Sequence, residues 1–364
     1  MSAQRITREA GMSLVELLVG IVIGLVATLA ISNVFGDFEA RKRVVANGAD
    51  AQSSGLTALY YLQRDAQNAG FGLPVSNSTD PSPYLCPLNT SIKQSNVTLN
   101  LSPVVIEEGG SGSDVVRIRY GSSPSGGASR RATGVMTAPT LDGQLFGCQV
   151  NDVVLFHQTV ASPKCTLARL GALNADRSIN TLTELNTAPT ANPVSNLNGT
   201  ETVRFSCLGA WNEYAYQVNA NLELTRTGGQ ADSGVFPDSQ AIPVVGEIVS
   251  LQAQYGISDA MDTTSSSTTG AAYLNQVSEW VDASGSFGSS ISLLDRNRIR
   301  AVRIAVVARD GALQKQVVSQ ACQGAVSGLS KVCLWRTDAT PQNVDLSAVA
   351  DWQRYRYRVF EAVI

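Results

Sequence analysis

Two hydrophobic patterns divide the chain. From Met12 to Ile31 nearly every residue is apolar, and Glu16 is the only charged residue in this run. A run of about 20 apolar residues is long enough to cross a bilayer as an α-helix. Charged residues return from Asp37 onward, and apolar residues then recur at helical spacing on one side. The pattern predicts one helix over 12–69, apolar all round in its first half and amphipathic in its second.

The predicted helix has clear end signals and an apolar stripe. No proline precedes Pro74, and Gly70 and Gly72 follow the last helical positions, as is typical of a helix end. We expect the stripe of the second half to pack under the rest of the chain. Its residues are Val45, Ala49, Leu56, Leu59, Leu62, Ala66 and Ala69.

After Pro74 the helical period gives way to short apolar runs, separated by loops rich in Gly, Ser, Pro and Asn. Such runs predict β-strands. The expected strands cover 103–106, 114–120, 152–157, 202–207, 215–225, 243–255, 299–308, 315–319 and 355–363. A short helix is expected at 271–281. The predicted fold class is α+β, with a long N-terminal helix and one antiparallel, loop-heavy, β-rich head.

Composition narrows the function classes. Charged residues make up 16% of the 364 residues, below the usual quarter, and Gly, Ser, Thr and Asn take their place. This balance is typical of β-rich proteins outside the cytoplasm. The net charge of −3 gives no electrostatic case for binding nucleic acid or an anionic membrane surface.

The chain has an even set of cysteines: Cys86, Cys148, Cys165, Cys207, Cys322 and Cys333. The absence of C-x-x-C and the single histidine disfavour a zinc site. Disulfides are expected if this part of the chain is exported, and buried free thiols are the alternative. Six cysteines allow 15 pairings, which the sequence does not resolve. Short loops favour three pairs: Cys322–Cys333, Cys148–Cys165 and, as the remainder, Cys86–Cys207.

Glu16 is the most unusual residue of the apolar run. A carboxylate inside a membrane-length helix costs roughly 2.5–3.5 kcal/mol on insertion scales, so it is a candidate functional residue. The segment before the run carries Arg5 and Arg8 and ends in Gly11. A secretory signal peptide is cut after its apolar run, whereas here the small residue lies before it.

The order of a charged leader, Gly11, Met12 and then Glu16 five positions after the glycine resembles the class III signal of type IV prepilins and type II secretion pseudopilins. The resemblance implies that a prepilin peptidase cuts after Gly11, N-methylates Met12 and leaves the apolar segment as an anchor. An ordinary single-pass anchor that tolerates Glu16 is the alternative interpretation.

Electrostatics gives Glu16 a role in assembly. The N-terminal ammonium of a neighbouring subunit can neutralise its carboxylate, and a neighbour in the wrong register leaves a charge unpaired. Glu16 is therefore the candidate register residue. Gly20 and Gly24 form a G-x-x-x-G pattern that lets membrane helices approach closely, so they are candidate packing residues.

The resemblance also implies a domain organisation. Residues 1–11 are the leader, 12–32 the transmembrane or filament-core helix, 33–70 the amphipathic spine and 74–364 a periplasmic head. The protein is expected in a bacterial inner membrane with a single pass and, after assembly, in an extracellular filament.

Four segments resemble PilW-type minor pilins: 62–72, 244–256, 299–309 and 352–361. This resemblance implies a minor pilin that primes a type IV pilus or lies at its tip. Its expected partners are other minor pilins and the major pilin through the N-terminal helix, the prepilin peptidase, the inner membrane and a tip adhesin. Two alternatives stay open: a J-like minor pseudopilin of a type II secretion system, and an adhesive or DNA-binding module mounted on a pilin helix.

Candidate catalytic residues are few, and no enzyme activity and no cofactor are expected. A Ser-His-Asp or Cys-His site would have to use His157, because it is the only histidine. A lone histidine on a strand is more often structural. Glu107 and Glu108 stand before the Gly/Ser-rich stretch 109–113, which predicts a hairpin loop instead of a pair of catalytic carboxylates.

Two further groups are candidate binding sites. Arg354, Arg356 and Arg358 alternate, so a strand would place them on one face, either as a basic stripe for a partner or as a solvated edge. Asp259 and Asp262 have the chemistry of calcium ligands but lack EF-hand spacing, so no metal is expected.

Overall fold

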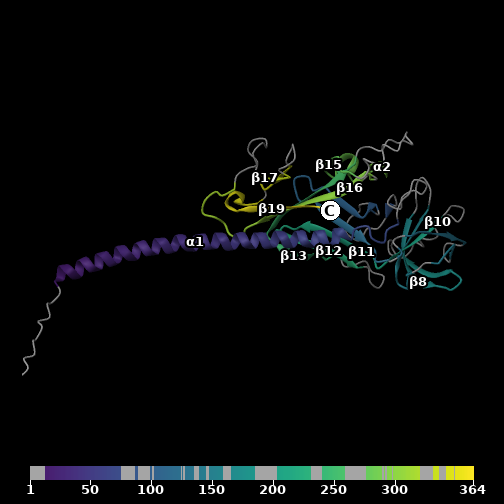
Figure 1. Cartoon of the computed structure of the whole chain (residues 1–364), viewed down its shortest axis with the longest axis horizontal. Coiled ribbons are helices and arrows are strands. Elements are labelled where there is room, and N and C mark those ends of the chain that lie inside the picture. The colour runs from purple at the N-terminus through teal and green to yellow at the C-terminus, as the bar shows by residue number, and fades with distance from the viewer. Residues whose placement is uncertain are drawn as a thin grey trace, which may run out of the picture. The chain divides into compact units, whose positions relative to one another are not determined.

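The computed structural model forms two compact units, Met1–Asp50 and Ala51–Ile364, which are described separately (Figure 1). It describes residues 13–74, 87–88, 99–100, 102–123, 125, 128–134, 139–144, 147–158, 165–184, 203–230, 240–258, 276–288, 291, 293–296, 298–319, 331–335, 342–347 and 349–364.

One helix, α1 (Leu14–Gln67), begins in the first unit and ends in the second. The sequence prediction of a single helix is therefore confirmed to within two residues at each end. Its last turn tightens, because the N–H of Ala69 donates to the carbonyl of Ala66 at 3.0 Å. Gly70 and Gly72 then adopt positive φ angles of 80° and 75°, as helix-ending glycines do.

In the second unit, α1 packs through small residues. Ala51, Gly55, Ala58 and Leu62 follow one another at helical spacing, and all are buried. A Cβ added at Gly55 would overlap the ring of Phe360, so the helix and that side chain touch without a gap. The predicted stripe is correct at Leu62 and Ala66. It is wrong at Val45, Ala49 and Leu56, which are exposed. Near Leu56, close packing selects the small side chains.

The rest of the second unit is mostly β-structure. Its strands are β1 (Pro87–Leu88), β2 (Leu99–Asn100), β3 (Val104–Glu107), β4 (Val115–Tyr120), β5 (Arg130–Thr133), β6 (Thr140–Leu141), β7 (Val153–Gln158), β8 (Cys165–Leu173), β9 (Ile179–Glu184), β10 (Val203–Gly209), β11 (Asn212–Val218), β12 (Glu223–Gln230), β13 (Ile242–Gly246), β14 (Ile248–Ile257), β15 (Glu279–Val281), β16 (Ile299–Arg309), β17 (Lys331–Leu334), β18 (Gln342–Asp345) and β19 (Tyr357–Val363). Its short helical segments are η4 (Gly285–Phe287), α2 (Leu293–Arg296) and η5 (Trp352–Arg354). The α+β class is confirmed.

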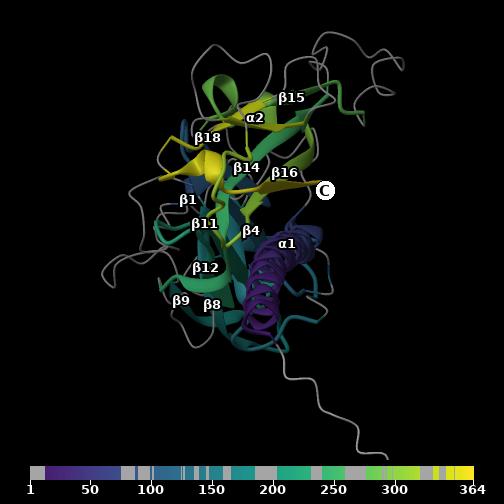
Figure 2. The ribbon, with the colours of Figure 1, turned by 90° about the vertical axis from the view of Figure 1, so that its left-hand side faces the viewer.

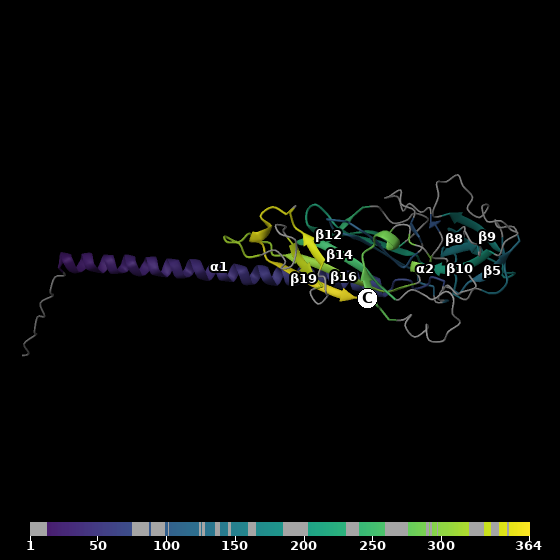
Figure 3. The ribbon, with the colours of Figure 1, turned by 90° about the horizontal axis from the view of Figure 1, so that it is seen from above.

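Two antiparallel sheets share the main hydrophobic core with α1. One has the order β13-β12-β11-β4-β3 and the other β15-β14-β16-β19. Figure 2 labels β4, β11 and β12 of the first sheet, and Figure 3 labels β14, β16 and β19 of the second. Ala58, Leu62 and Ala66 of α1 belong to the same core cluster as Tyr216 of β11 and Ile304 of β16. A third sheet, in the order β6-β5-β10-β7-β8-β9, encloses a separate core.

Asp114 joins the two sheets. Its N–H donates to the carbonyl of Leu251 at 2.8 Å, and its carboxylate accepts the N–H of Ala253 at 2.8 Å. The side chain of Gln252 reaches back to the carbonyl of Gly112 at 2.7 Å. The loop between β3 and β4 therefore covers the part of the β14 edge that β15 does not pair with.

The carboxyl of Asp114 is buried among other acids. Burial, with smaller contributions from the negative charges of Glu108 and Asp282, raises its pKa to about 7. The N–H groups of Gly109 and Ala253 oppose the shift because they donate to the carboxylate.

Two predicted strands are each a pair of strands. The segment 215–225 turns between β11 and β12, because the side chain of Asn219 accepts the N–H groups of Asn221 and Glu223, both at 3.0 Å. The segment 243–255 breaks between β13 and β14 at Glu247, whose φ angle is 61°. Both breaks are local turn chemistry that the apolar pattern does not record.

Two other predictions are wrong. The segment 315–319 is not a strand, because the N–H groups of Val318 and Ser319 both donate to the carbonyl of Gln353 instead of a strand ladder. The expected helix at 271–281 ends in β15, and its first five residues lie outside the described part of the chain.

The structure pairs Cys148 with Cys207, whose Cα atoms are 6.0 Å apart. The predicted pairs Cys148–Cys165 and Cys86–Cys207 are therefore wrong. Cys165 lies opposite His157, at the far end of β7 from Cys148. Cys207 lies at the end of β10 that runs beside the start of β7. Strand pairing, and not loop length, brings the two sulfurs together.

We predict that Gly55→Ala lowers the free energy of unfolding by about 1–3 kcal/mol, because the added methyl group displaces the ring of Phe360. This loss exceeds the gain of about 1 kcal/mol in helix propensity. Urea unfolding of the detergent-solubilised protein measures it, with Ser53→Ala on the exposed side as the matched control. Phe360→Leu should recover part of the loss, and a net stabilisation by Gly55→Ala would contradict the contact.

We predict a pH dependence from Asp114. The folded state keeps its proton to a higher pH than the unfolded chain does. The associated stability is therefore complete below pH 3.8 and is lost as pH rises through about 7. Urea unfolding between about pH 5 and pH 8 should show this fall. Asp114→Asn should flatten it, whereas the exposed control Asp351→Asn should not. Equal slopes for both variants would rule out Asp114 as the source.

Candidate functional site

The N-terminal part of α1 holds the sequence-predicted assembly residue. Glu16 lies in the first helical turn and is exposed. The N–H groups of Glu16 and Leu17 both donate to the carbonyl of Ser13, at 2.9 and 3.2 Å. A carboxylate in the first turn is stabilised by the helix dipole. Gly11 and Met12 lie outside the described residues.

The segment Leu14–Gly36 is long and apolar enough to cross a membrane, by its length and composition. A signal sequence near an N-terminus meets the same criterion. Its hydroxyl groups are satisfied within the helix, since Thr28 donates to the carbonyl of Gly24 at 2.7 Å and Ser32 to that of Thr28 at 2.9 Å. Internal satisfaction of polar groups is what a hydrocarbon environment requires.

Gly20 and Gly24 leave an open surface on α1. A Cβ added at either glycine would meet no atom within 4 Å. The single chain therefore places nothing against them, and their role in helix packing stays a prediction.

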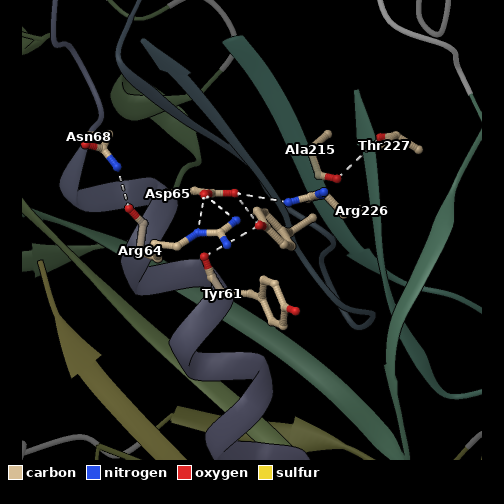
Figure 4. A network of polar contacts seen from close by, with 8 residues as sticks. Tyr61, Arg64, Asp65, Asn68, Ala215, Arg226 and Thr227 are labelled. Atoms are coloured by element: carbon tan, nitrogen blue, oxygen red, sulfur yellow. Dashed lines mark hydrogen bonds and ion pairs between the residues drawn. The ribbon is translucent and has the colours of Figure 1, made fainter. Parts of the chain in front are cut away.

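The second candidate site lies where α1 meets the five-stranded sheet, and its centre is Asp65 (Figure 4). Asp65 is only 1% exposed. Tyr216 of β11 donates its hydroxyl to Asp65 Oδ2 at 2.5 Å, and Arg226 of β12 places Nη1 3.7 Å from the same oxygen. On the helix itself, Nε and Nη2 of Arg64 both donate to Asp65 Oδ1 at 3.0 Å. Both carboxylate oxygens therefore have partners.

Electrostatics in this site favours a neutral tyrosine beside a charged acid. Burial raises the pKa of Tyr216, and the hydrogen bond and negative charge of Asp65 raise it further. Arg226 opposes the shift. The hydroxyl of Tyr216 thus stays a donor to Asp65, and the site can hold the helix in place.

Sequence analysis missed Asp65. It lies seven residues after Ala58 and three after Leu62, on the same face of the helix as these buried residues. The helical spacing alone therefore places a charged residue among buried apolar ones, and this is a signal that the sequence contains. Tyr216 and Arg226 carry no comparable signal, because their approach to Asp65 depends on the strand pairing.

A second ion pair joins two strands of the same sheet. Arg119 of β4 places Nη2 3.1 Å from Oε1 of Glu213 on β11, and both side chains are buried. The carbonyl of Arg119 accepts the N–H of Gly70, at 2.9 Å, just after α1 ends. The end of the helix is therefore fixed to the sheet by backbone as well as by side chains.

The other sequence candidates fall into structural roles. His157 is buried on β7. Glu107 forms an ion pair with Arg117, and the loop between β3 and β4 is the predicted hairpin. The predicted arginine stripe does not form, because Arg354 lies in η5 and only Arg358 is on β19.

The one group with metal-ligand geometry in the described part of the chain is Cys148, Asp152 and Cys207. Its two sulfurs form the disulfide, so they are not free to bind a metal. Cys333 is also disulfide-bonded. Its predicted partner Cys322 lies outside the described residues, so this pair stays a prediction.

Three further sequence candidates, Cys86, Asp259 and Asp262, lie outside the described residues. Of Cys165 only the backbone is described. The proposed calcium ligands therefore have no structural test.

Residues 215–364 match the protein-family model PilW, described as Type IV Pilus-assembly protein W. The match supports a type IV pilus-related protein. It begins within β11 and includes Tyr216, Arg226 and Phe360, which all contact α1. No curated protein and no solved structure matches the chain.

We predict that Tyr216→Phe lowers the free energy of unfolding by about 1.5–3 kcal/mol, because a buried carboxylate loses a short hydrogen bond. Urea unfolding of the detergent-solubilised protein measures the change. Tyr60→Phe, on an exposed tyrosine of the same helix, is the control and should change little. In a double-mutant cycle, Tyr216→Phe and Asp65→Asn should couple, and additive effects would show that the two groups do not interact.

Proposed function

We propose that the protein is a minor pilin, which primes assembly of a type IV pilus or lies at its tip. The PilW match over residues 215–364 carries this proposal. The match supports a part in pilus assembly, and the N-terminal segment adds a means of assembly. An exposed apolar helix segment with a carboxylate in its first turn needs both a hydrophobic surrounding and a cation.

Glu16 is proposed to find its cation on another subunit. The chain is processed after Gly11, which frees the ammonium group of Met12, and prepilin peptidase then methylates it. This ammonium pairs with Glu16 of a neighbouring subunit. A neighbour shifted along the axis would leave both charges without a partner in a low-dielectric surrounding, so the pair selects one register.

The helix is proposed to hold the protein in the inner membrane before assembly, with the head in the periplasm. Other minor pilins and the major pilin then contact it through the exposed face of α1 that includes Gly20 and Gly24. The described residues of the second unit form a compact fold with its own core, so the head needs no partner to complete it. The head is therefore proposed to contact other subunits through its surface. The protein acts by binding and carries out no chemistry.

We predict that Glu16→Ala leaves processing after Gly11 intact but lowers the amount of protein in sheared pili by about tenfold or more. Methylation of Met12 should also fall. Mass spectrometry of the membrane protein gives the N-terminus, and immunoblots of sheared filaments give the incorporation. Glu39→Ala, which removes an exposed acid from the same helix, is the matched control and should assemble as the wild type does.

Two outcomes would contradict this proposal. An intact residue 1 in the membrane protein would exclude the processing step. Normal incorporation of Glu16→Ala would exclude the register role, although not the membership of the filament. Recovery of the protein with secretion-system components instead of pili would favour the pseudopilin alternative.

A further inference from the structure

The five-stranded sheet is interrupted by a long excursion of the chain. Tyr120, the last residue of β4, is paired directly with Asn212, the first residue of β11. Between these neighbours the chain leaves the sheet at residue 121 and returns at residue 211. Six strands, β5 to β10, lie within this excursion. Ends that meet at adjacent points of one sheet are the mark of an inserted domain.

The six inserted strands close into a barrel. Their order is β6-β5-β10-β7-β8-β9, so β6 and β9 are the ends of the sheet. Thr140 of β6 forms a bridge with Ser178, directly before β9. The N–H of Leu141 donates to the carbonyl of Arg177 at 3.1 Å, and that of Ile179 to Pro139 at 2.9 Å. These contacts join the two ends of the sheet directly before β9.

The barrel has its own core and its own cross-link. The interior cluster consists of ten buried residues, and none of them belongs to the core shared by α1 and the other two sheets. Phe156 and Phe205 meet edge to face inside it, with ring centroids 4.9 Å apart. The Cys148–Cys207 disulfide joins the start of β7 to β10. These are the parts that a small domain needs to fold as a unit.

The outgoing and returning chains form a neck between the barrel and the five-stranded sheet, and β1 makes a further contact with β8 of the barrel. The outgoing and returning chains lie side by side, since the N–H groups of Ser122 and Ser123 both donate to the carbonyl of Leu208, at 2.8 and 3.0 Å. The N–H of Gly121 donates to Phe71 at 2.6 Å, just after the end of α1. A Cβ at Gly72 would lie 3.2 Å from both Gly121 Cα and the carbonyl oxygen of Leu208. The backbones approach each other so closely here that only glycine, which has no Cβ atom, fits at this position.

The described surface of the barrel is polar. Val150 is its only large apolar side chain that is exposed among the described residues. On α1 and its end, by contrast, Leu56, Tyr60 and Phe71 are each more than half exposed. In a permanent assembly, the surface that a subunit buries against its partners is rich in apolar side chains. These side chains are exposed in the free subunit. The described part of the barrel surface therefore lacks the apolar side chains of a filament-packing element.

We propose that residues 121–211 are an inserted β-barrel that folds as a cooperative unit of its own and that filament assembly does not use. The PilW match begins at residue 215, after the barrel has ended, so the match lies wholly on the fold that carries the insertion. The role in assembly rests on the function proposed above, whereas the separate folding does not.

Hydrogen exchange on the full chain tests the folding. Cys148→Ser together with Cys207→Ser should increase exchange at least tenfold in β7 and β10 but leave β14 and β16 unchanged. Tyr216→Phe should affect the other part of the unit. It should increase exchange in β11 and β14 and leave β7 unchanged. Loosening of β14 and β16 by loss of the disulfide would show one cooperative unit and overturn the proposal.

Excision tests the role in assembly. Residues 124–207 are replaced by a four-residue Gly/Ser linker, which keeps the neck from Gly121 to Ser123 and from Leu208 to Trp211. Because this removes three cysteines, the variant is made with Cys86 and with Cys86→Ser, and full-length Cys86→Ser is the control. Incorporation into sheared pili should stay within about twofold of the control.

The possible failures separate the two proposals. An excised protein that keeps exchange protection in β14 and β16 but does not enter pili would make the barrel an assembly element and overturn the inference. An excised protein that loses this protection would show that the scaffold needs the barrel, which overturns it as well. If the wild type itself is absent from pili, the proposed function fails, and the exchange experiment still decides whether the barrel is a separate unit.

Discussion

The buried carboxylate of Asp65 fixes how α1 can pack against the five-stranded sheet. A buried charge that loses its partners costs several kcal/mol, so the helix is held where Tyr216 and Arg226 both reach Oδ2 of Asp65. A rotation by one residue, about 100°, would turn Asp65 away from both. In the allowed orientation the small side chains of Ala51, Gly55 and Ala58 face inward. Close packing on Phe360 is thus a consequence of satisfying one charge.

The same constraint reaches the inserted barrel. Because α1 is held by Asp65, the glycines that follow it lie at a fixed place on the edge of β4, where Gly70 bonds to Arg119. Gly72 and Gly121 then allow the two chains of the neck to pass within van der Waals distance. The insertion leaves from this neck, so one scaffold sets the starting point of a barrel whose core it does not share.

Local sequence patterns predicted the long helix and several strands. The features that they did not predict depend on pairing between strands that are far apart in the sequence. The extent of α1 and the strands near 114–120 and 299–308 follow from apolar periodicity and helix-ending glycines. The barrel does not, because its closure joins Thr140 to Ser178 and inserts β10 between β5 and β7. The Cys148–Cys207 pair depends on that same order of strands. Of the residues around Asp65, only Asp65 itself has a signal in the sequence, namely its place in the buried stripe.

Asp65 and Glu16 lie on the same helix, and each carboxylate needs a partner for its charge. They meet this requirement in different ways. Asp65 is buried by its own chain, and that chain supplies a tyrosine and two arginines to it. Glu16 is exposed in the single chain, in an apolar segment that calls for a hydrophobic surrounding. In that surrounding the carboxylate has the same need for a cation, and the proposed source is a neighbour's terminus. A charge satisfied within the chain stabilises a fold, whereas a charge satisfied only by another chain makes assembly selective. The proposed division of labour along α1 follows from where each acid finds its partner.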